Sequence, residues 1–446
     1  MVHRKTPLTV SNSTLTPVGK AHHVEQARTP VCLLHFASTS ACGHSGLRSQ
    51  SLLCIAQPCN RRVTSDIVNV MLSVTVFYLQ TLKTKDMKNI WKLTLLAVAA
   101  FCLASCSDDN EGKSGDDKKP ANIKGVYILS EGNSYKGING DLTAYDPETK
   151  TCTNGIFKNV NQRALSGTSN DGIVYGSKLY IANNDENIVE VVDAKTARSI
   201  KTITLNGARC IKADNGYIYV TSFTESKVTK IDTVNYSVAG TIATDAYPEG
   251  MAVMNNILYV ANSGYGSGST VTAINLANFT KLTTITVPTN PVDLATDGNS
   301  LFLLCSGKYN ADYSGYDENP AVYTLGTDGK TVKIADATYM AIGPNKLYLV
   351  DNNFYSTSGV TYSVYDLNKK SVSTWTPSEL PFSPYTIAVN PANGDVYITS
   401  YVSKDYGNGN IYPDYEGNGR VMRYDSNGTK LDMFVCGVNP GTVIFF

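Results

Sequence analysis

The sequence predicts an all-β fold of seven similar units, because one short apolar strand recurs seven times. Each copy has an aromatic residue near its start, then β-branched or aliphatic residues, then a small polar residue. These anchor strands are residues 125–130, 178–183, 217–222, 257–262, 301–306, 346–351 and 395–400. Short apolar runs bounded by Asn, Ser and Gly are typical of strands buried on both faces. Copies roughly 40 to 50 residues apart match the period of β-propeller blades.

Three further strands follow the same pattern in each unit. A second strand after each anchor ends in Asp or Asn in most copies, as at Asp146, Asp193 and Asp232. We expect these side chains to start turns, because they bond to the backbone two residues further on. A third strand follows the turn, as in residues 199–205, and a Pro- or Gly-bearing loop leads to a fourth, as in residues 248–253. Four strands in each of seven units predict a seven-bladed β-propeller.

The two ends of the repeat region complement each other. The first anchor strand has no proline-led strand before it, and residues 439–446 form one with no anchor after it. The C-terminal strand is therefore predicted to be the innermost strand of the first blade, which closes the ring.

Composition excludes several classes of function. Residues 1–106 hold 11 Lys+Arg and 3 Asp+Glu, which leaves 38 − 11 = 27 and 38 − 3 = 35 for residues 107–446, a net charge of −8. This charge argues against nucleic-acid binding, which needs clustered Lys and Arg. All five histidines lie in the first 44 residues, so the repeat region lacks the usual general base and the commonest metal ligand. Cys210 and Cys305 are expected to be small buried hydrophobes, and a disulfide among the four body cysteines stays open.

The N-terminal part carries a targeting signal at an unusual position. Residues 87–92 are a basic n-region, residues 93–102 are an apolar h-region, and Leu103-Ala104-Ser105-Cys106 follows. The tetrapeptide resembles a bacterial lipobox, which implies cleavage before Cys106 and lipidation of that cysteine. Because such a signal works at the N-terminus, we expect translation to begin at Met87 and residues 1–86 to be an upstream extension. The predicted domains are residues 1–86, a signal peptide at 87–105, a lipidated tether at 106–120 and the propeller at 121–446.

The anchor strands resemble the YVTN-type propeller family, as in Tyr259-Val260-Ala261-Asn262 and Tyr219-Val220-Thr221-Ser222. The acidic residues 107–111 after Cys106 resemble the surface-export signal of Bacteroidetes lipoproteins. Architecture, export signal and an aromatic loop face together resemble the cobalamin-binding BtuG lipoproteins. That resemblance implies a protein anchored by lipid in the outer membrane and exposed at the cell surface. It also implies capture of a corrinoid and its transfer to a TonB-dependent outer-membrane transporter, with no catalysis and no cofactor.

Two sets of loops are predicted to share one face around the ring axis: those after the anchor strands and those before the proline-led strands. Their tyrosines offer flat apolar surface with a polar rim, which suits a bulky planar ligand or another protein. The wider loop set includes Glu131, Tyr339 and Tyr415. The predicted ligand-binding residues are Asn133, Tyr135, Asn184, Arg209, Phe223, Tyr247, Tyr265, Tyr309, Phe354, Tyr355, Tyr385 and Tyr401. No metal ligand is predicted. The acidic loop at 405–420 could coordinate calcium, but it does not have EF-hand spacing, so a solvated loop is the preferred interpretation.

Two other classes of function stay open. The same face could bind a protein or a glycan, as in a surface adhesin or scaffold. A propeller lyase or glycan-active enzyme is the third hypothesis; Asp185 and Glu186 are its paired carboxylates, although adjacent turn residues need not converge. The absence of histidine from the repeat region weighs against the lyase.

Overall fold

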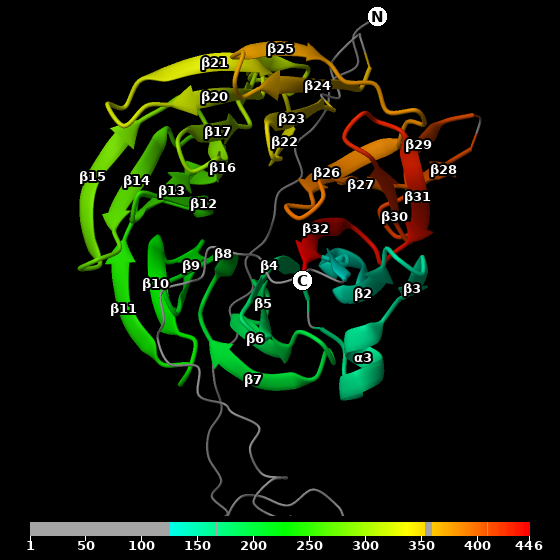
Figure 1. The fold of residues 1–446 in the computed structure, drawn as a ribbon, viewed down its shortest axis with the longest axis horizontal. Coiled ribbons are helices and arrows are strands. Elements are labelled where there is room, and N and C mark those ends of the chain that lie inside the picture. The colour runs from blue at the N-terminus through cyan, green and yellow to red at the C-terminus, as the bar shows by residue number, and fades with distance from the viewer. Residues whose placement is uncertain (1–124, 166, 353–358, 408) are drawn as a thin grey trace, which may run out of the picture. The chain divides into compact units, whose positions relative to one another are not determined.

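Seven four-stranded antiparallel sheets form a ring of blades (Figure 1). The computed structural model describes residues 125–165, 167–352, 359–407 and 409–446. The predicted signal peptide, Cys106, Phe354 and Tyr355 lie outside these residues. Within the described residues, no helix combines the length and apolar character needed to cross a membrane.

Each blade is described from its innermost to its outermost strand. Blade 1 comprises β32 (Pro440–Phe445), β1 (Val126–Ser130), β2 (Asp141–Asp146) and β3 (Thr151–Thr153). Blade 2 comprises β4 (Ser169–Tyr175), β5 (Lys178–Asn183), β6 (Ile188–Asp193) and β7 (Ser199–Thr204). Blade 3 comprises β8 (Ala208–Asp214), β9 (Tyr217–Ser222), β10 (Lys227–Asp232) and β11 (Val238–Ala243). Blade 4 comprises β12 (Pro248–Met254), β13 (Ile257–Asn262), β14 (Thr270–Asn275) and β15 (Thr280–Thr286).

The remaining blades contain two inserted hairpins. Blade 5 comprises β16 (Pro291–Thr296), β17 (Leu301–Cys305), β20 (Ala321–Leu325) and β21 (Thr331–Asp336). Blade 6 comprises β22 (Tyr339–Ile342), β23 (Lys346–Asp351), β24 (Thr361–Asp366) and β25 (Ser371–Thr374). Blade 7 comprises β26 (Ser383–Val389), β27 (Val396–Tyr401), β30 (Arg420–Tyr424) and β31 (Lys430–Val435). The hairpins are β18 (Lys308–Tyr309) with β19 (Tyr316–Glu318), and β28 (Ser403–Asp405) with β29 (Ile411–Pro413). Short helices are η1 (Ser134–Lys136), α3 (Ile156–Asn161) and η2 (Gly264–Gly266).

The hydrophobic core lies between blades. Each of the seven core clusters of the described residues joins two neighbouring blades. The anchor-strand aromatics supply much of this core; Tyr127, Tyr180 and Tyr219 are at most 1% exposed. Burial of an aromatic side chain of this kind stabilises the fold by about 1.5–3 kcal/mol. The predicted anchor strands are thus the buried second strands of the blades.

The C-terminal strand closes the ring, as predicted. β32 pairs with β1 in antiparallel register, with Tyr127 opposite Ile444 and Ile128 opposite Val443. The Gly125 amide donates to the Phe446 carbonyl at 2.9 Å. The rings of Tyr127 and Phe446 stack with centroids 4.3 Å apart. The first blade is therefore made from both ends of the described chain.

The aspartates that end the strands after the anchors, such as Asp146 in β2 and Asp193 in β6, start turns, as predicted. The Asp146 carboxylate accepts from the Glu148 amide at 2.8 Å, and Asp193 accepts from the Thr196 amide at 2.8 Å. These side chains satisfy turn amides.

The four body cysteines are free. Cys305 is buried in the core, as predicted, and Cys152 is exposed. The prediction for Cys210 is wrong in part, because its side chain is only half-buried. Cys210 follows Arg209 at the irregular start of β8, where charged groups surround it.

Candidate functional site

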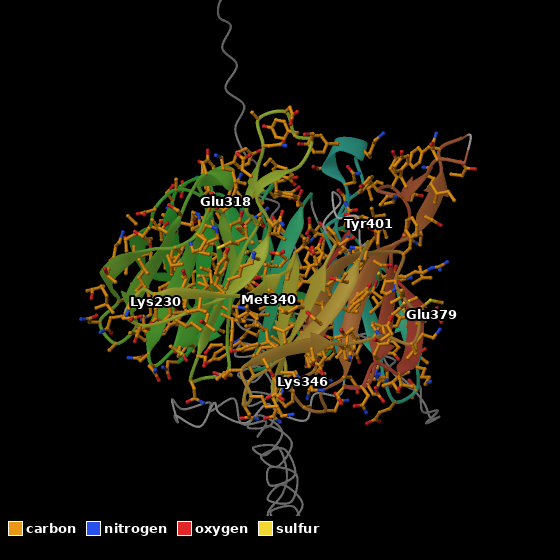
Figure 2. All side chains as sticks on the ribbon, turned by 90° about the horizontal axis from the view of Figure 1, so that it is seen from above. Lys230, Glu318, Met340, Lys346, Glu379 and Tyr401 are labelled. Carbon is orange, nitrogen blue, oxygen red and sulfur yellow. The ribbon has the colours of Figure 1, made fainter. Side chains whose placement is uncertain are left out.

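The two predicted sets of loops do lie on one face, which we call the loop face. The Phe223 amide donates to the Gly207 carbonyl at 2.8 Å, and the Ser263 amide donates to the Tyr247 carbonyl at 3.0 Å. Each of these bonds joins a loop after an anchor strand to the loop before the inner strand of the same blade. Figure 2 places Tyr401 and Glu318 towards the loop face and Lys346 at the opposite edge.

A first aromatic group, the Tyr247 cluster, consists of Phe223, Tyr247 and Tyr265. The ring centroids of Phe223 and Tyr247 are 4.8 Å apart, and those of Tyr247 and Tyr265 are 5.4 Å apart. Tyr265 is 79% exposed. The Arg209 guanidinium lies 5.0 Å from the centre of the Phe223 ring. Blades 3 and 4 thus present an open aromatic surface with a cation beneath it.

Tyr247 has a backbone conformation that Gly or Asn adopts elsewhere in the ring. The residue just before the inner strand has a positive φ in four loops: 62° at Gly207, 54° at Tyr247, 60° at Asn290 and 54° at Asn439. In each loop the carbonyl of this residue accepts a hydrogen bond from the loop after the anchor strand. A tyrosine in this left-handed turn carries strain that Gly and Asn avoid. Tyr265 of the same cluster also has a positive φ, 56°.

A second aromatic group, the Tyr385 cluster, consists of Tyr385, Tyr401 and Tyr415. Ring centroids are 5.0 Å apart both for Tyr385 with Tyr401 and for Tyr401 with Tyr415. The Tyr385 hydroxyl is hydrogen-bonded to the side chain of Glu131. Burial raises the pKa of Tyr385 and of Tyr401 above the usual tyrosine value, so both hydroxyls stay protonated and can donate.

Charged groups between the two clusters lie near the ring axis. Arg209 Nε is 2.8 Å from Glu249 Oε2, and both residues come from the irregular starts of inner strands. Burial raises the pKa of Glu131 to about 7; the Tyr385 hydrogen bond and Arg209 oppose this rise, and Glu249 adds to it. Burial also raises the pKa of Glu249, against the nearby Arg209 charge. The site therefore contains a carboxyl group that titrates near neutral pH.

Some buried amide groups on or near the loop face lack partners. Within the described residues, Asn170 Oδ1, Asn184 Nδ2 and Asn439 Oδ1 are buried without a hydrogen bond. Buried polar atoms are usually paired with protein groups or with ordered water, and these three atoms have room for neither a large partner nor a direct contact from outside. Asn184 is one of the ligand-binding residues predicted from the sequence.

The remaining predicted residues lie in other parts of the loop face. Tyr135 in η1 is 99% exposed, and Asn133 Nδ2 donates to the Tyr415 carbonyl at 3.0 Å. Tyr309 stacks on Tyr316, at 4.5 Å, within the β18–β19 hairpin. Figure 2 shows this yellow-green hairpin and the orange-brown β28–β29 hairpin standing above the body of the propeller. Tyr309 therefore belongs to a raised hairpin, while Asn133 connects η1 to the Tyr385 cluster.

Glu249 was missed as a site residue. The sequence shows it only as the second residue of a proline-led strand. What marks Glu249 in the structure is the irregular strand pairing between Pro248 and Met251. This irregularity turns side chains towards the ring axis.

Three carboxylates of the loop at 405–420 have partners within the protein. Lys404 Nζ is 3.4 Å from Asp414 Oδ1, and Lys136 Nζ is 2.9 Å from Glu416 Oε1. The Asp405 carboxylate accepts from the Gly407 amide at 2.7 Å. Across the described part of the chain, no three His, Cys, Asp or Glu side chains are grouped closely enough to hold a metal ion.

Residues 124–434 match the family model described as "Domain of unknown function (DUF5074)". The chain belongs to this family. None of the curated proteins gives a significant match.

Solved structures resemble this DUF5074 propeller at low sequence identity. A hypothetical selenium-binding protein from Sulfolobus tokodaii has 12% identity and a TM-score of 0.53, covering 74% of this chain and 94% of its own. A putative 6-phosphogluconolactonase from Bacteroides uniformis has 10% identity and a TM-score of 0.53, with 72% and 100% covered. A putative 6-phosphogluconolactonase from Bacteroides fragilis has 10% identity and a TM-score of 0.51, with 74% and 100% covered. At such identity these similarities show the fold alone.

Proposed function

We propose that this protein is a non-enzymatic binding lipoprotein that captures a corrinoid on its loop face. In this proposal the lipid on Cys106 anchors the protein to the outer membrane, exposed at the cell surface. The captured corrinoid then passes to a TonB-dependent transporter. The resemblance to YVTN-type and BtuG lipoproteins of Bacteroidetes supports the anchor, the ligand and the transporter.

The observation that carries the proposal is the presence of two aromatic clusters and of charged groups between them on one face. A corrinoid is a broad flat ring edged with amides. The Tyr247 and Tyr385 clusters supply flat apolar surfaces for the ring. Arg209, Glu249 and the Tyr385 hydroxyl supply hydrogen-bonding groups for the rim.

Calorimetric titration of residues 121–446 with cyanocobalamin tests the proposal, with haem as a control ligand. We expect one-to-one binding with cyanocobalamin and at least tenfold weaker binding in Tyr247→Ala. Val234→Ala is the matched control, because Val234 is 77% exposed in a turn on the opposite face. Absence of both heat and thermal stabilisation with cyanocobalamin would refute corrinoid capture.

The raised hairpins favour a second candidate, a surface adhesin that binds a protein or a glycan. Tyr406 and Tyr412 are 54% and 48% exposed on the β28–β29 hairpin, and Tyr313 is 71% exposed next to β18. Exposed tyrosines on projecting hairpins suit a macromolecular surface. Glycan-array binding that is lost in Tyr412→Ala, together with no response to cyanocobalamin, would establish this candidate instead.

A further inference from the structure

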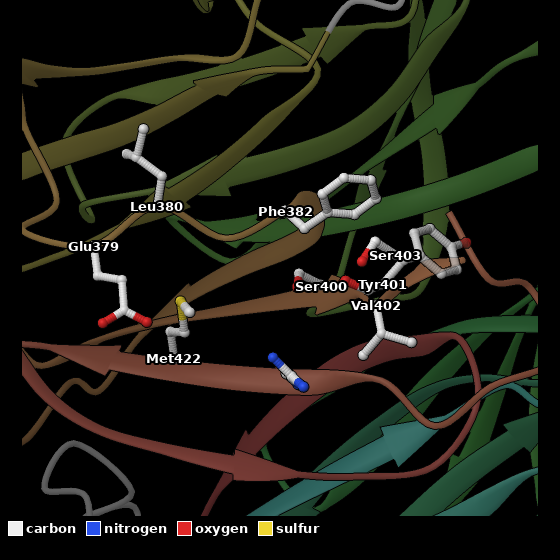
Figure 3. Close-up of a pocket in the computed structure, with 9 residues that line it drawn as sticks. Glu379, Leu380, Phe382, Ser400, Tyr401, Val402, Ser403 and Met422 are labelled. Atoms are coloured by element: carbon white, nitrogen blue, oxygen red, sulfur yellow. Dashed lines mark hydrogen bonds between the residues drawn. The ribbon is translucent and has the colours of Figure 1, made fainter. Parts of the chain in front are cut away.

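A cavity of about 360 Å³ lies at the side of blade 7, next to the Tyr385 cluster (Figure 3). The loop before β26 forms one wall, and β27, β28 and β30 form the rest. Tyr401 borders both this side pocket and the Tyr385 cluster. Small-molecule sites start at about this size.

The side pocket has an apolar wall that remains exposed. Leu380 is 59% exposed and Phe382 is 47% exposed, while Val402 and Met422 complete the apolar lining. Figure 3 shows Leu380 and Phe382 along one side of the pocket and Val402 and Met422 on the other. Exposed apolar residues that line a concave site are typical of ligand-binding sites, because a bound ligand shields them from water.

The wall is held rigidly in place. Pro377, Pro381 and Pro384 restrict the loop backbone. The Ser378 amide donates to the Gly428 carbonyl at 2.8 Å, and the Tyr424 hydroxyl donates to the Glu379 carbonyl at 2.7 Å. The exposure of Leu380 and Phe382 is thus built into the fold, and a ligand would meet a preorganised surface.

The lining of the side pocket contains one acidic and one basic residue, Glu379 and Arg420. Its acidic residue, Glu379, forms an ion pair with Lys430. Arg420, the first residue of β30, is exposed, and within the described residues its guanidinium has no hydrogen-bond or ion-pair partner. Because side chains two residues apart on a strand share a face, Arg420 lies on the same face of β30 as Met422. One free cation therefore borders the apolar lining.

We infer that the side pocket binds a small organic acid with an apolar body, whose carboxylate pairs with Arg420. The guanidinium can bond a carboxylate in a bidentate manner. Leu380, Phe382 and Met422 cover the apolar body, and Ser403 lies at the rim. This inference does not depend on corrinoid capture, because Arg420 and the apolar wall belong to neither aromatic cluster and Tyr401 is the one shared residue.

The first test is a fluorescence titration with anilinonaphthalene sulfonate, an apolar aromatic anion. We expect about tenfold weaker binding in Arg420→Gln, and similar weakening in Leu380→Ser, with unchanged circular dichroism. Arg198→Gln is the matched control, since Arg198 is an exposed arginine near the outer strand of blade 2. Equal binding by wild type and Arg420→Gln would overturn the inference.

Competition separates the charge from the apolar body. Phenylacetate should displace the dye, whereas phenylacetamide, which lacks the charge, and acetate, which lacks the apolar body, should not. Equal displacement by phenylacetamide would overturn the role of Arg420, and equal displacement by acetate would overturn the role of the apolar wall. Cyanocobalamin titration of Arg420→Gln keeps this result distinguishable from the test of the loop face.

Discussion

Replacing Tyr247 with Asn should separate ligand binding from stability. The left-handed backbone at Tyr247, φ 54°, costs about 1–2 kcal/mol for a non-Gly residue, and Asn tolerates it as at Asn290 and Asn439. The lost ring contacts with Phe223 and Tyr265 are worth about 0.5–1.5 kcal/mol each. Because strain relief of about 1.5 kcal/mol opposes a loss of about 2 kcal/mol from the two ring contacts, we expect the free energy of unfolding to fall by about 0.5 kcal/mol and by no more than about 2 kcal/mol.

Binding should respond differently from stability. Loss of the Tyr247 ring should weaken cyanocobalamin binding at least tenfold, which corresponds to about 1.4 kcal/mol. Urea unfolding and calorimetric titration of Tyr247→Asn measure the two quantities, and Tyr247→Phe, which keeps the ring, should bind within about threefold of wild type. A destabilisation above about 3 kcal/mol would show that Tyr247 is a core residue. Unchanged affinity would refute its role in ligand binding.

Three further predictions concern the framework of the site. Deletion of residues 442–446 removes most of β32 and should destabilise the protein by about 10 kcal/mol, enough to abolish cooperative urea unfolding, and a peptide of residues 436–446 added in trans should restore it. Since the pKa of Glu131 is raised to about 7 when folded, its contribution to stability is present below pH about 4.5 and is lost as pH rises to about 7. Glu131→Gln should remove this slope in urea unfolding measured across that range, and an unchanged slope would contradict the assignment. Glu190 is fully buried, and its Oε1 is 2.7 Å from Nη2 of the half-exposed Arg163. Arg163→Ala leaves the buried carboxylate without its cation, so it should lower the free energy of unfolding by about 2 kcal/mol, as measured by thermal unfolding. Glu190→Gln, which removes the buried charge itself, should cost less. Equal losses would show that the buried charge needs no partner.

The fold could be predicted because its signals are local. Each anchor strand is an apolar run with a buried aromatic, and each turn aspartate bonds to amides within three residues of itself. Ring closure by residues 440–445 followed from counting strand types at the two ends. These features depend on neighbours in sequence or on a simple repeat.

The site was harder to predict because side chains from distant blades meet at it. Nothing near Glu131 in sequence indicates that Arg209 and Tyr385 influence its pKa. Tyrosine content indicated the loop face, yet it did not separate Tyr247 in a cluster from Tyr309 in a raised hairpin. The closed ring determines which loop residues of different blades lie close together. A pattern in a single sequence predicts the ring but not these distances.

The irregular starts of the inner strands explain why this ring can carry a specific site. Register shifts occur between Ala208 and Ile211, between Pro248 and Met251 and between Pro384 and Thr386. The residues within these shifts include Arg209, Glu249 and Tyr385, which are the groups that meet near the axis. A bulge frees a side chain from strict alternation, so its identity is not fixed by the core. The seven-fold repeat therefore supplies the frame, and these few positions supply the charged and aromatic groups of the candidate site.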